Sequence, residues 1–150
     1  MAKFVFRLEP LLKARKRQEE QEQRALAELQ RQRMALEDTL RHYQQRITHG
    51  KESLRGALAG ALDMRALRLE AGASLHLVRK AQQVVLQLAG LGQRLASARA
   101  SLIEARKRRR ALELLRERRF EQWKKRLDKA EDAQLDELAT NAAARKEADP

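Results

Sequence analysis

The chain has 150 residues with a formal net charge of +12 at pH 7, and 36% of them are charged while 3% are aromatic. This composition is typical of long helices and excludes a large aromatic core, and the absence of cysteine excludes disulfides and thiolate chemistry. No stretch reaches the roughly 18 to 20 uncharged apolar residues of a membrane span, and charges at the start do not fit a signal peptide. We therefore expect a soluble, cytoplasmic protein without a transmembrane segment.

Apolar residues recur with coiled-coil spacing over the first third of the chain. Pro10 suits the first turn of a helix, because the amide proton that proline lacks would have no partner there. Alternate steps of three and four residues give nine apolar positions out of fourteen, which form an edge narrow enough to pack on one partner helix. The pattern predicts a helical arm over about 8–56. The fourteen positions are Leu8, Leu12, Arg15, Glu19, Glu22, Leu26, Leu29, Arg33, Leu36, Leu40, Tyr43, Ile47, Gly50 and Leu54.

Glycines interrupt this pattern in the middle of the chain. The glycines from Gly56 onward end the first arm, and Asp63 can cap a short helix over about 63–71. The run Gly72-Ala73-Ser74 is expected to end this short helix, and the serine can cap the next helix. We expect a bend over about 57–74 that contains a short helix or an irregular segment.

A second narrow apolar edge follows the bend and predicts an arm over about 75–140, with a frayed tail at 141–150. Its positions are Leu77, Ala81, Val84, Leu88, Leu91, Leu95, Ala98, Leu102, Ala105 and Leu112. Beyond Leu112 the register shifts to Leu115, Phe120, Trp123, Leu127 and Leu138, which is a stutter that locally unwinds a supercoil. Two explanations stay open. The arm outruns its partner or repacks against Phe4, Phe6 and Leu8, or the face of Phe120, Trp123 and Leu127 binds another protein.

The two arms together predict the fold class. We expect an all-α protein, an elongated antiparallel two-helix coiled-coil hairpin that forms a single domain over 1–150. Antiparallel packing brings the first turns of arm one beside the later turns of arm two. An exposed apolar edge could pack on a second copy of the chain, so the sequence favours neither a monomer nor a dimer.

Basic residues gather in one segment of the second arm. From Arg106 to Lys129 there are twelve lysines or arginines and four carboxylates, so this segment carries +8 of the net charge of +12. The five consecutive cations that begin it surround the helix, so a single neighbouring helix cannot neutralise them all. Such a surface favours an acidic partner, which can be nucleic acid, anionic lipid or an acidic protein surface.

Nucleic acid is the first alternative, since basic helices beside leucine heptads occur in zipper-type DNA readers. In those proteins the basic region precedes the zipper and has no apolar edge of its own. Here it follows most of the second edge and is interleaved with Leu112, Leu114, Leu115 and Phe120. We expect no specific nucleic acid, and keep nonspecific binding to nucleic acid or an anionic membrane surface as the alternative function.

Catalytic and metal-binding patterns are weak. The run Gly90-Leu91-Gly92 lacks the third glycine of a phosphate loop, and its place in the apolar edge predicts a close contact between helices instead. His42 and His49 share a helix face but have no third ligand nearby, and His76 also has none, so we expect solvated histidines. A two-helix hairpin is expected to offer no concave pocket that would perturb a carboxylate pKa. We predict no enzyme, no cofactor and no metal.

The two ends of the chain resemble one known family. Phe4-Val5-Phe6-Arg7-Leu8-Glu9-Pro10-Leu11-Leu12-Lys13-Ala14-Arg15-Lys16 resembles the amino-terminal signature of the flagellar export protein FliJ. Leu135-Asp136-Glu137-Leu138-Ala139, followed by Ala142-Ala143-Ala144-Arg145-Lys146, resembles its carboxyl-terminal signature. Length, the two-arm layout and the basic stretch agree over essentially the whole chain. The ending favours the flagellar branch over the related injectisome stalk proteins.

The resemblance implies a noncatalytic stalk of the flagellar type III export apparatus, similar to the antiparallel coiled coil of the rotary ATP synthase γ stalk. Family members insert into the hexameric export ATPase FliI and stimulate or assemble its ring. They also contact the export gate protein FlhA and assist export chaperones, which supports flagellum assembly, motility and chemotaxis. The implied location is cytoplasmic, peripherally associated with the cytoplasmic face of the inner membrane at the flagellar base.

The resemblance also implies two binding surfaces. The ATPase-binding surface would be formed by both chain ends, and reversing the charge of Arg116 and Arg119 is expected to abolish that binding. Its residues here are Arg106, Lys107, Arg108, Arg109, Arg110, Arg116, Arg118, Arg119, Lys124 and Lys125, with Leu135 and Leu138 as apolar contacts. The gate-binding surface would lie nearer the bend, on the first arm at Leu36, Leu40, Tyr43 and Ile47, which are also positions of the apolar edge. No residue of the second arm is assigned to it.

Overall fold

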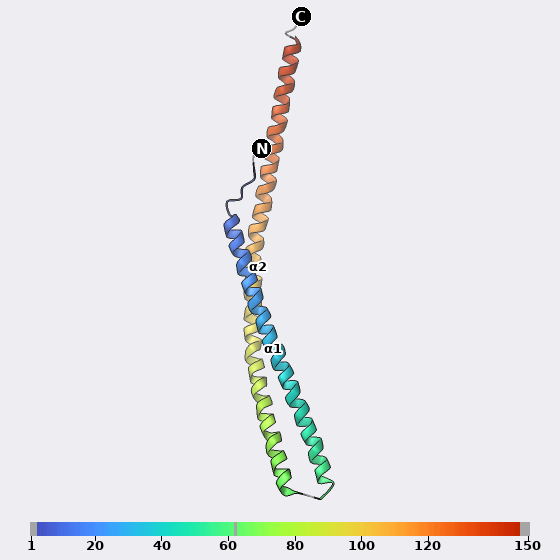
Figure 1. Cartoon of the computed structure of the whole chain (residues 1–150). Coiled ribbons are helices and arrows are strands. Elements are labelled where there is room, and N and C mark those ends of the chain that lie inside the picture. Colours follow the sequence, from blue (N-terminus) through green and yellow to red (C-terminus); the bar gives the residue numbers. More distant parts are fainter. Residues whose placement is uncertain (1–2, 62, 148–150) are drawn as a thin grey trace. The chain divides into compact units, whose positions relative to one another are not determined.

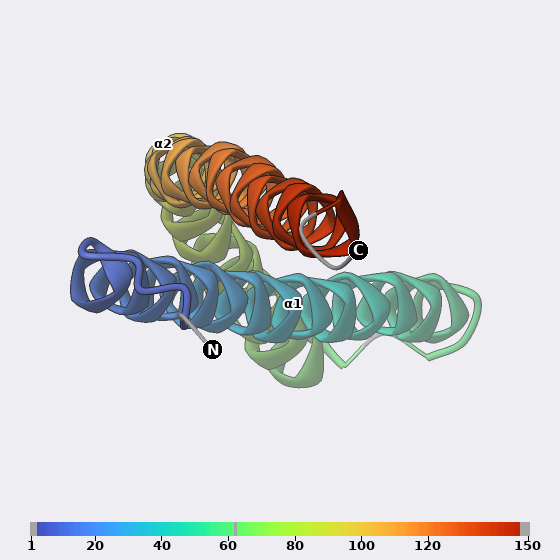
Figure 2. The same cartoon turned by 90° about the horizontal axis from the view of Figure 1, so that it is seen from above.

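The structure, a computed structural model, describes residues 3–61 and 63–147. It consists of two helices joined by a short bend, α1 over Glu9–Leu58 and α2 over Met64–Glu147 (Figure 1). The described residues contain no strand, so the prediction of an all-α helical hairpin is confirmed. Figure 2 shows the same two helices turned by 90°.

The internal contacts divide the chain into two units, and each unit contains part of both helices. The terminal unit comprises Met1–Glu19 and Ala105–Pro150, and the hairpin unit comprises Glu20–Glu104. The bend belongs to the hairpin unit, where it reverses the chain direction so that the two helices run antiparallel. That the whole chain acts as one coiled-coil domain stays a prediction.

The predicted apolar edges form the interface between the helices of the hairpin unit. Val84, Leu91, Leu95 and Leu102 of α2 are buried. Every predicted edge position of α1 from Leu26 to Leu54 is buried or half-buried, except Arg33, which is exposed. Full burial of a leucine or valine side chain contributes about 1.5–3 kcal/mol, so this narrow edge is the main stabilising surface of the unit.

The start of α2 is capped as predicted. The Asp63 carboxylate accepts hydrogen bonds from the backbone N–H groups of Arg65 at 2.9 Å and Ala66 at 3.4 Å. These amides have no partner inside the helix, and such a cap contributes about 1 kcal/mol. On the other side of the bend, the N–H of Ala59 donates to the carbonyl of Gly56 at 3.2 Å, and α1 ends at Leu58.

The structure corrects the expected helix break at Gly72-Ala73-Ser74. α2 passes through these residues without interruption, so there is no separate short helix and the second arm begins at Met64. A single glycine costs a helix only about 1 kcal/mol, which packing along the rest of α2 offsets. Ser74 does not cap a helix. It faces the buried Gly50 of α1, and a Cβ added to Gly50 would lie 3.2 Å from the serine Oγ.

Gly90 and Gly92 do not mark the predicted close contact between helices, and that prediction was wrong. Both residues are exposed, and a Cβ at either position would meet nothing within 4 Å. They lie one residue to either side of the buried Leu91, so the helix rotation directs them away from the interface. Close approach occurs instead at Gly50.

Replacing Gly90 and Gly92 together with alanine is expected to stabilise the chain by about 1–2 kcal/mol. Alanine has the higher helix propensity, and both positions have open space for a methyl group. Urea unfolding followed by circular dichroism measures the change. Gly50→Ala is the matched control, because its Cβ meets Ser74 and Glu70 at 3.2 and 3.3 Å and the gain should shrink or reverse. An equal gain at Gly50 would contradict the close packing there.

The end of α2 also differs from the expectation. The helix continues to Glu147, so residues 141–147 of the predicted frayed tail are helical, whereas residues 148–150 of that tail lie outside the described residues. Every described side chain from residue 128 to 141 is exposed. Over the part of the chain that the structure describes, neither helix has a stretch apolar enough to cross a membrane.

Candidate functional site

The first turns of α1 are anchored to α2 in the terminal unit. Phe6 precedes the helix and is buried, and the N–H of Glu9 donates to its carbonyl at 3.0 Å. Leu12 follows on the first turn, is only 1% exposed, and is the largest fully buried side chain among the described residues. In the same unit, α2 contributes the buried Ala105. The amino-terminal residues are therefore part of a packed unit.

An aromatic cluster extends this anchor along α2. The ring of Phe4 lies 5.3 Å from that of Phe120 in an edge-to-face arrangement, and 5.9 Å from that of Trp123. Phe120 and Trp123 stack on each other at 5.7 Å. Of the two explanations for the shifted register, repacking against the start of the chain is confirmed for these two side chains. Phe120 is nevertheless 45% exposed.

Ion pairs connect the same two segments. Glu9 pairs with Arg116 at 3.3 Å, and Lys16 pairs with Glu113 at 3.6 Å. Glu19 pairs with Arg106 at 3.4 Å and accepts a hydrogen bond from Arg109. Isolated surface pairs contribute little, but Glu19, Arg109 and Glu113 are partly buried and share partners, so they form a network.

Glu113 is the carboxylate at the centre of this network. Burial raises its pKa, but the hydrogen bond from Arg109, the charges of Arg109 and Lys16 and the hydrogen bond from Arg110 outweigh burial, so the pKa falls below the ordinary value of 4.5. Hydrogen bonds to Glu19 and Glu113 raise the pKa of Arg109, which stays charged at any accessible pH. The lowered pKa of Glu113 therefore comes from its basic partners.

Glu113→Gln is expected to destabilise the terminal unit by about 1 kcal/mol at pH 7 and to have a smaller effect at acidic pH. Because the folded pKa of Glu113 is lowered, its stabilisation is present above the unfolded pKa and is lost as pH falls through the folded pKa. Trp123 fluorescence during urea unfolding at several pH values measures this. The control is Glu117→Gln, whose carboxylate is 56% exposed and, among the described residues, pairs only with Arg110. A pH-independent difference for Glu113→Gln would contradict the assignment.

The structure separates the basic candidate residues into two groups. The first group pairs with carboxylates of the terminal unit and consists of Arg106, Arg109, Arg110 and Arg116. Lys107 also has an interaction partner and is counted with them. The second group forms no ion pair or side-chain hydrogen bond within the described residues, and all its members are exposed. It consists of Arg108, Arg118, Arg119, Lys124 and Lys125. We call this second group the open cations.

The open cations occupy several faces of α2. Arg118 and Lys125 are about two turns apart and share one face, and Arg108 and Arg119 are about three turns apart and share another. Lys124 lies one turn beyond Phe120, on the side of the aromatic cluster. The two apolar candidates Leu135 and Leu138 are largely exposed in the part of α2 beyond these contacts. No described residue covers them, and their binding role stays a prediction.

The gate-binding candidates lie in the hairpin unit. Leu36, Leu40, Tyr43 and Ile47 are half-buried in the interface between the helices, as their edge positions predict. Leu40 and Ile47 also line an apolar groove of about 530 Å³, and their binding role is untested.

The groove adds residues of α2 that the sequence did not assign. Val78, Ala81, Val85 and Leu86 form its other side, and Leu86 is 72% exposed. One feature of the sequence could have identified these groove residues. The run from Ala81 to Gln93 contains no charged residue in a chain that is 36% charged.

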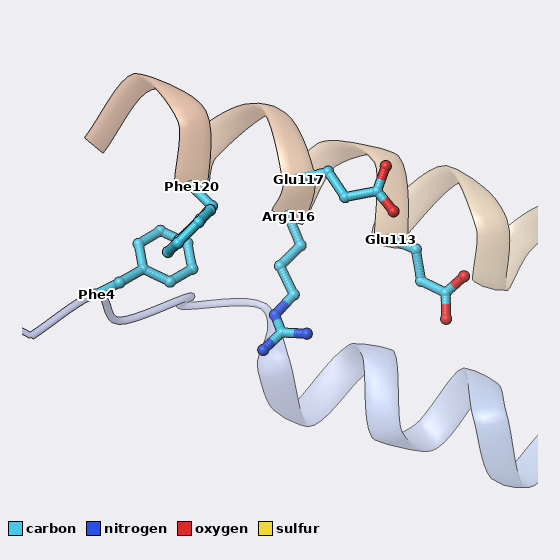
Figure 3. Close-up of a pocket in the computed structure, with 5 residues that line it drawn as sticks. All are labelled: Phe4, Glu113, Arg116, Glu117 and Phe120. Carbon is cyan, nitrogen blue, oxygen red and sulfur yellow. The ribbon is translucent and has the colours of Figure 1, made fainter. Parts of the chain in front are cut away.

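His42 and His49 are exposed, and among the described residues no group of three or more His, Cys, Asp or Glu side chains is placed to hold a metal ion. The expectation of no concave pocket was wrong, since the terminal unit has one of about 460 Å³ beside Phe4 and Phe120 (Figure 3).

These features define a helical-hairpin protein with a basic terminal unit and an apolar groove in its hairpin unit. The family model for the flagellar FliJ protein matches residues 4–148, and the chain belongs to this family. It is therefore a noncatalytic component of the flagellar export apparatus. No curated protein and no solved structure matches the chain.

Proposed function

We propose that this chain is the stalk that binds the hexameric export ATPase FliI, stimulates it or assembles its ring, and links it to the export gate protein FlhA. It assists export chaperones in the cytoplasm, at the cytoplasmic face of the inner membrane, and so supports flagellum assembly and motility. The observation that carries the proposal is the group of open cations, which are exposed and without partners among the described residues of the terminal unit. An acidic surface inside a ring is the kind of partner that they fit.

The pairing pattern supports a division of the cations between two proposed roles. Arg109 and Arg116 already pair with carboxylates that hold α1 to α2, so a second acidic partner would compete with existing contacts. The open cations have no such contact to lose. We therefore assign attachment of α1 to the paired cations and ATPase binding mainly to the open ones, with Leu135 and Leu138 as further apolar contacts.

The groove of the hairpin unit is the proposed gate-binding surface. Leu40 and Ile47 face Val78, Val85 and Leu86 across it. An amphipathic helix can lay its apolar side into such a groove. Leu36 and Tyr43 lie on the same edge of α1 as Leu40 and Ile47 and extend the proposed surface.

ATP hydrolysis by the export ATPase of the same cell, with and without this protein, tests the proposal. Electron microscopy of the same samples shows whether the ATPase assembles. We expect faster turnover together with six-fold rings that are filled at the centre. Unchanged turnover with empty or unassembled particles would remove the stalk function.

Binding at increasing salt separates the proposal from nonspecific adhesion to nucleic acid or anionic membranes. A ring partner predicts saturable binding at low stoichiometry that depends on which cations are changed. Adhesion to polyanions predicts binding without fixed stoichiometry that falls steeply with salt and follows total charge.

A further inference from the structure

The pocket of the terminal unit is lined by residues of two chain segments. Phe4 of the amino-terminal segment and Phe120 of α2 face each other on one side, and Arg116, Glu113 and Glu117 of α2 line the rest (Figure 3). Its volume of about 460 Å³ is in the range of pockets that bind small groups. Phe120 is 45% exposed, so its ring is accessible although it contacts Phe4.

The charged side chains that line the pocket are already paired. Arg116 pairs with Glu9, Glu117 pairs with Arg110, and Glu113 is shared by Arg109, Arg110 and Lys16. A charged ligand group would have to displace one of these contacts. The accessible ring of Phe120 has no such competition, so the pocket favours an uncharged apolar or aromatic side chain.

One open cation lies beside the pocket. Lys124 lies one turn beyond Phe120 on the same side of α2. Its side chain is exposed and makes no ion pair within the described residues. A ligand that fills the pocket therefore gains from a carboxylate placed beside its apolar group.

We propose that this pocket receives an aromatic or aliphatic side chain from an acidic protein segment, of which a carboxylate pairs with Lys124. The identity of the partner rests on the proposed function, in which the protein that carries this segment is the export ATPase. The pocket chemistry itself can be tested without that protein.

The single tryptophan of the chain provides the test, because Trp123 lies 5.9 Å from Phe4 and 5.7 Å from Phe120. The full-length protein is titrated with two synthetic pentapeptides, one with a central phenylalanine between two pairs of glutamates and one with a central alanine there. We expect the phenylalanine peptide to bind about tenfold more tightly, the effect of burying most of one such side chain. It should also shift the Trp123 emission.

Charge variants test the flanking contacts. Lys124→Glu should weaken both peptides about tenfold, because it reverses a charge beside the pocket. Lys125→Glu makes the same change in net charge about 100° around the helix and should have at most about a twofold effect at physiological salt. Equal losses in both variants would indicate adhesion by total charge and overturn the inference.

The variant Phe4→Leu tests the aromatic side of the pocket while keeping an apolar anchor. It should reduce the preference for the phenylalanine peptide, because only the ring of Phe120 then remains, and it should leave the contribution of the glutamates. Equal binding of the two peptides to the wild-type protein would overturn the inference, even if the ATPase is still stimulated. Selective peptide binding without any ATPase binding would instead overturn the proposed function.

Discussion

The double variant Arg118→Glu with Arg119→Glu is expected to bind the export ATPase about 100-fold more weakly than the wild-type protein and to lose its stimulation. Both side chains are exposed and form no ion pair within the described residues, so their charges are available to a partner. Reversing each charge replaces attraction by repulsion, which we expect to cost about 1.4 kcal/mol per residue, a factor of ten each. Titration of the ATPase at fixed ionic strength measures the affinity.

The matched control is Arg65→Glu with Arg68→Glu in the hairpin unit. These arginines are also exposed and without ion pairs in the described chain, and the change in net charge is the same. We expect this control to bind within about twofold of the wild type. Equal weakening of both variants would show that total charge decides binding. Wild-type affinity of the Arg118 and Arg119 variant would exclude this surface.

Arg116 is less suited to this test than the sequence suggested. Its side chain pairs with Glu9 at 3.3 Å. Reversing Arg116 would therefore disturb the attachment of α1 to α2 as well as any ATPase contact. Arg119, which was also predicted from the sequence, has no such second role among the described residues.

Leu12→Ala is expected to destabilise the terminal unit by about 2–4 kcal/mol. Leu12 is 1% exposed, so truncation loses its burial and leaves a cavity under the first turns of α1. We expect these turns and Phe4 to detach from α2 at lower urea concentration. Trp123 fluorescence reports the detachment because Phe4 lies 5.9 Å from its ring.

Leu11→Ala is the control for this variant. It makes the same change in the preceding residue, but Leu11 is 42% exposed, so we expect a loss of about 1 kcal/mol or less. Similar losses at both positions would contradict the orientation of the first turns. Circular dichroism in the same samples separates detachment of α1 from loss of helix.

Periodicity made the helices and their interface predictable. A spacing of three and four residues determines which edge of a helix is apolar, whatever lies opposite, and so Leu91, Leu95 and Leu102 were placed in the core correctly. Capping is equally local, since Asp63 needs only the amides of the next residues. Glycine is less informative, because a helix that gains packing elsewhere continues through Gly72.

The sequence by itself therefore determined the helical hairpin, its apolar edges and the concentration of positive charge between Arg106 and Lys129. Only the tertiary structure decided that Gly50 and not Gly90 marks the close helix approach, and that Phe4 covers part of Phe120. It also separated paired from open cations. The physical reason is that these features depend on the register and rotation of residues far apart in the chain, which side-chain packing sets. Charge composition is additive along a sequence, whereas the pairing of each charge is a property of the folded unit.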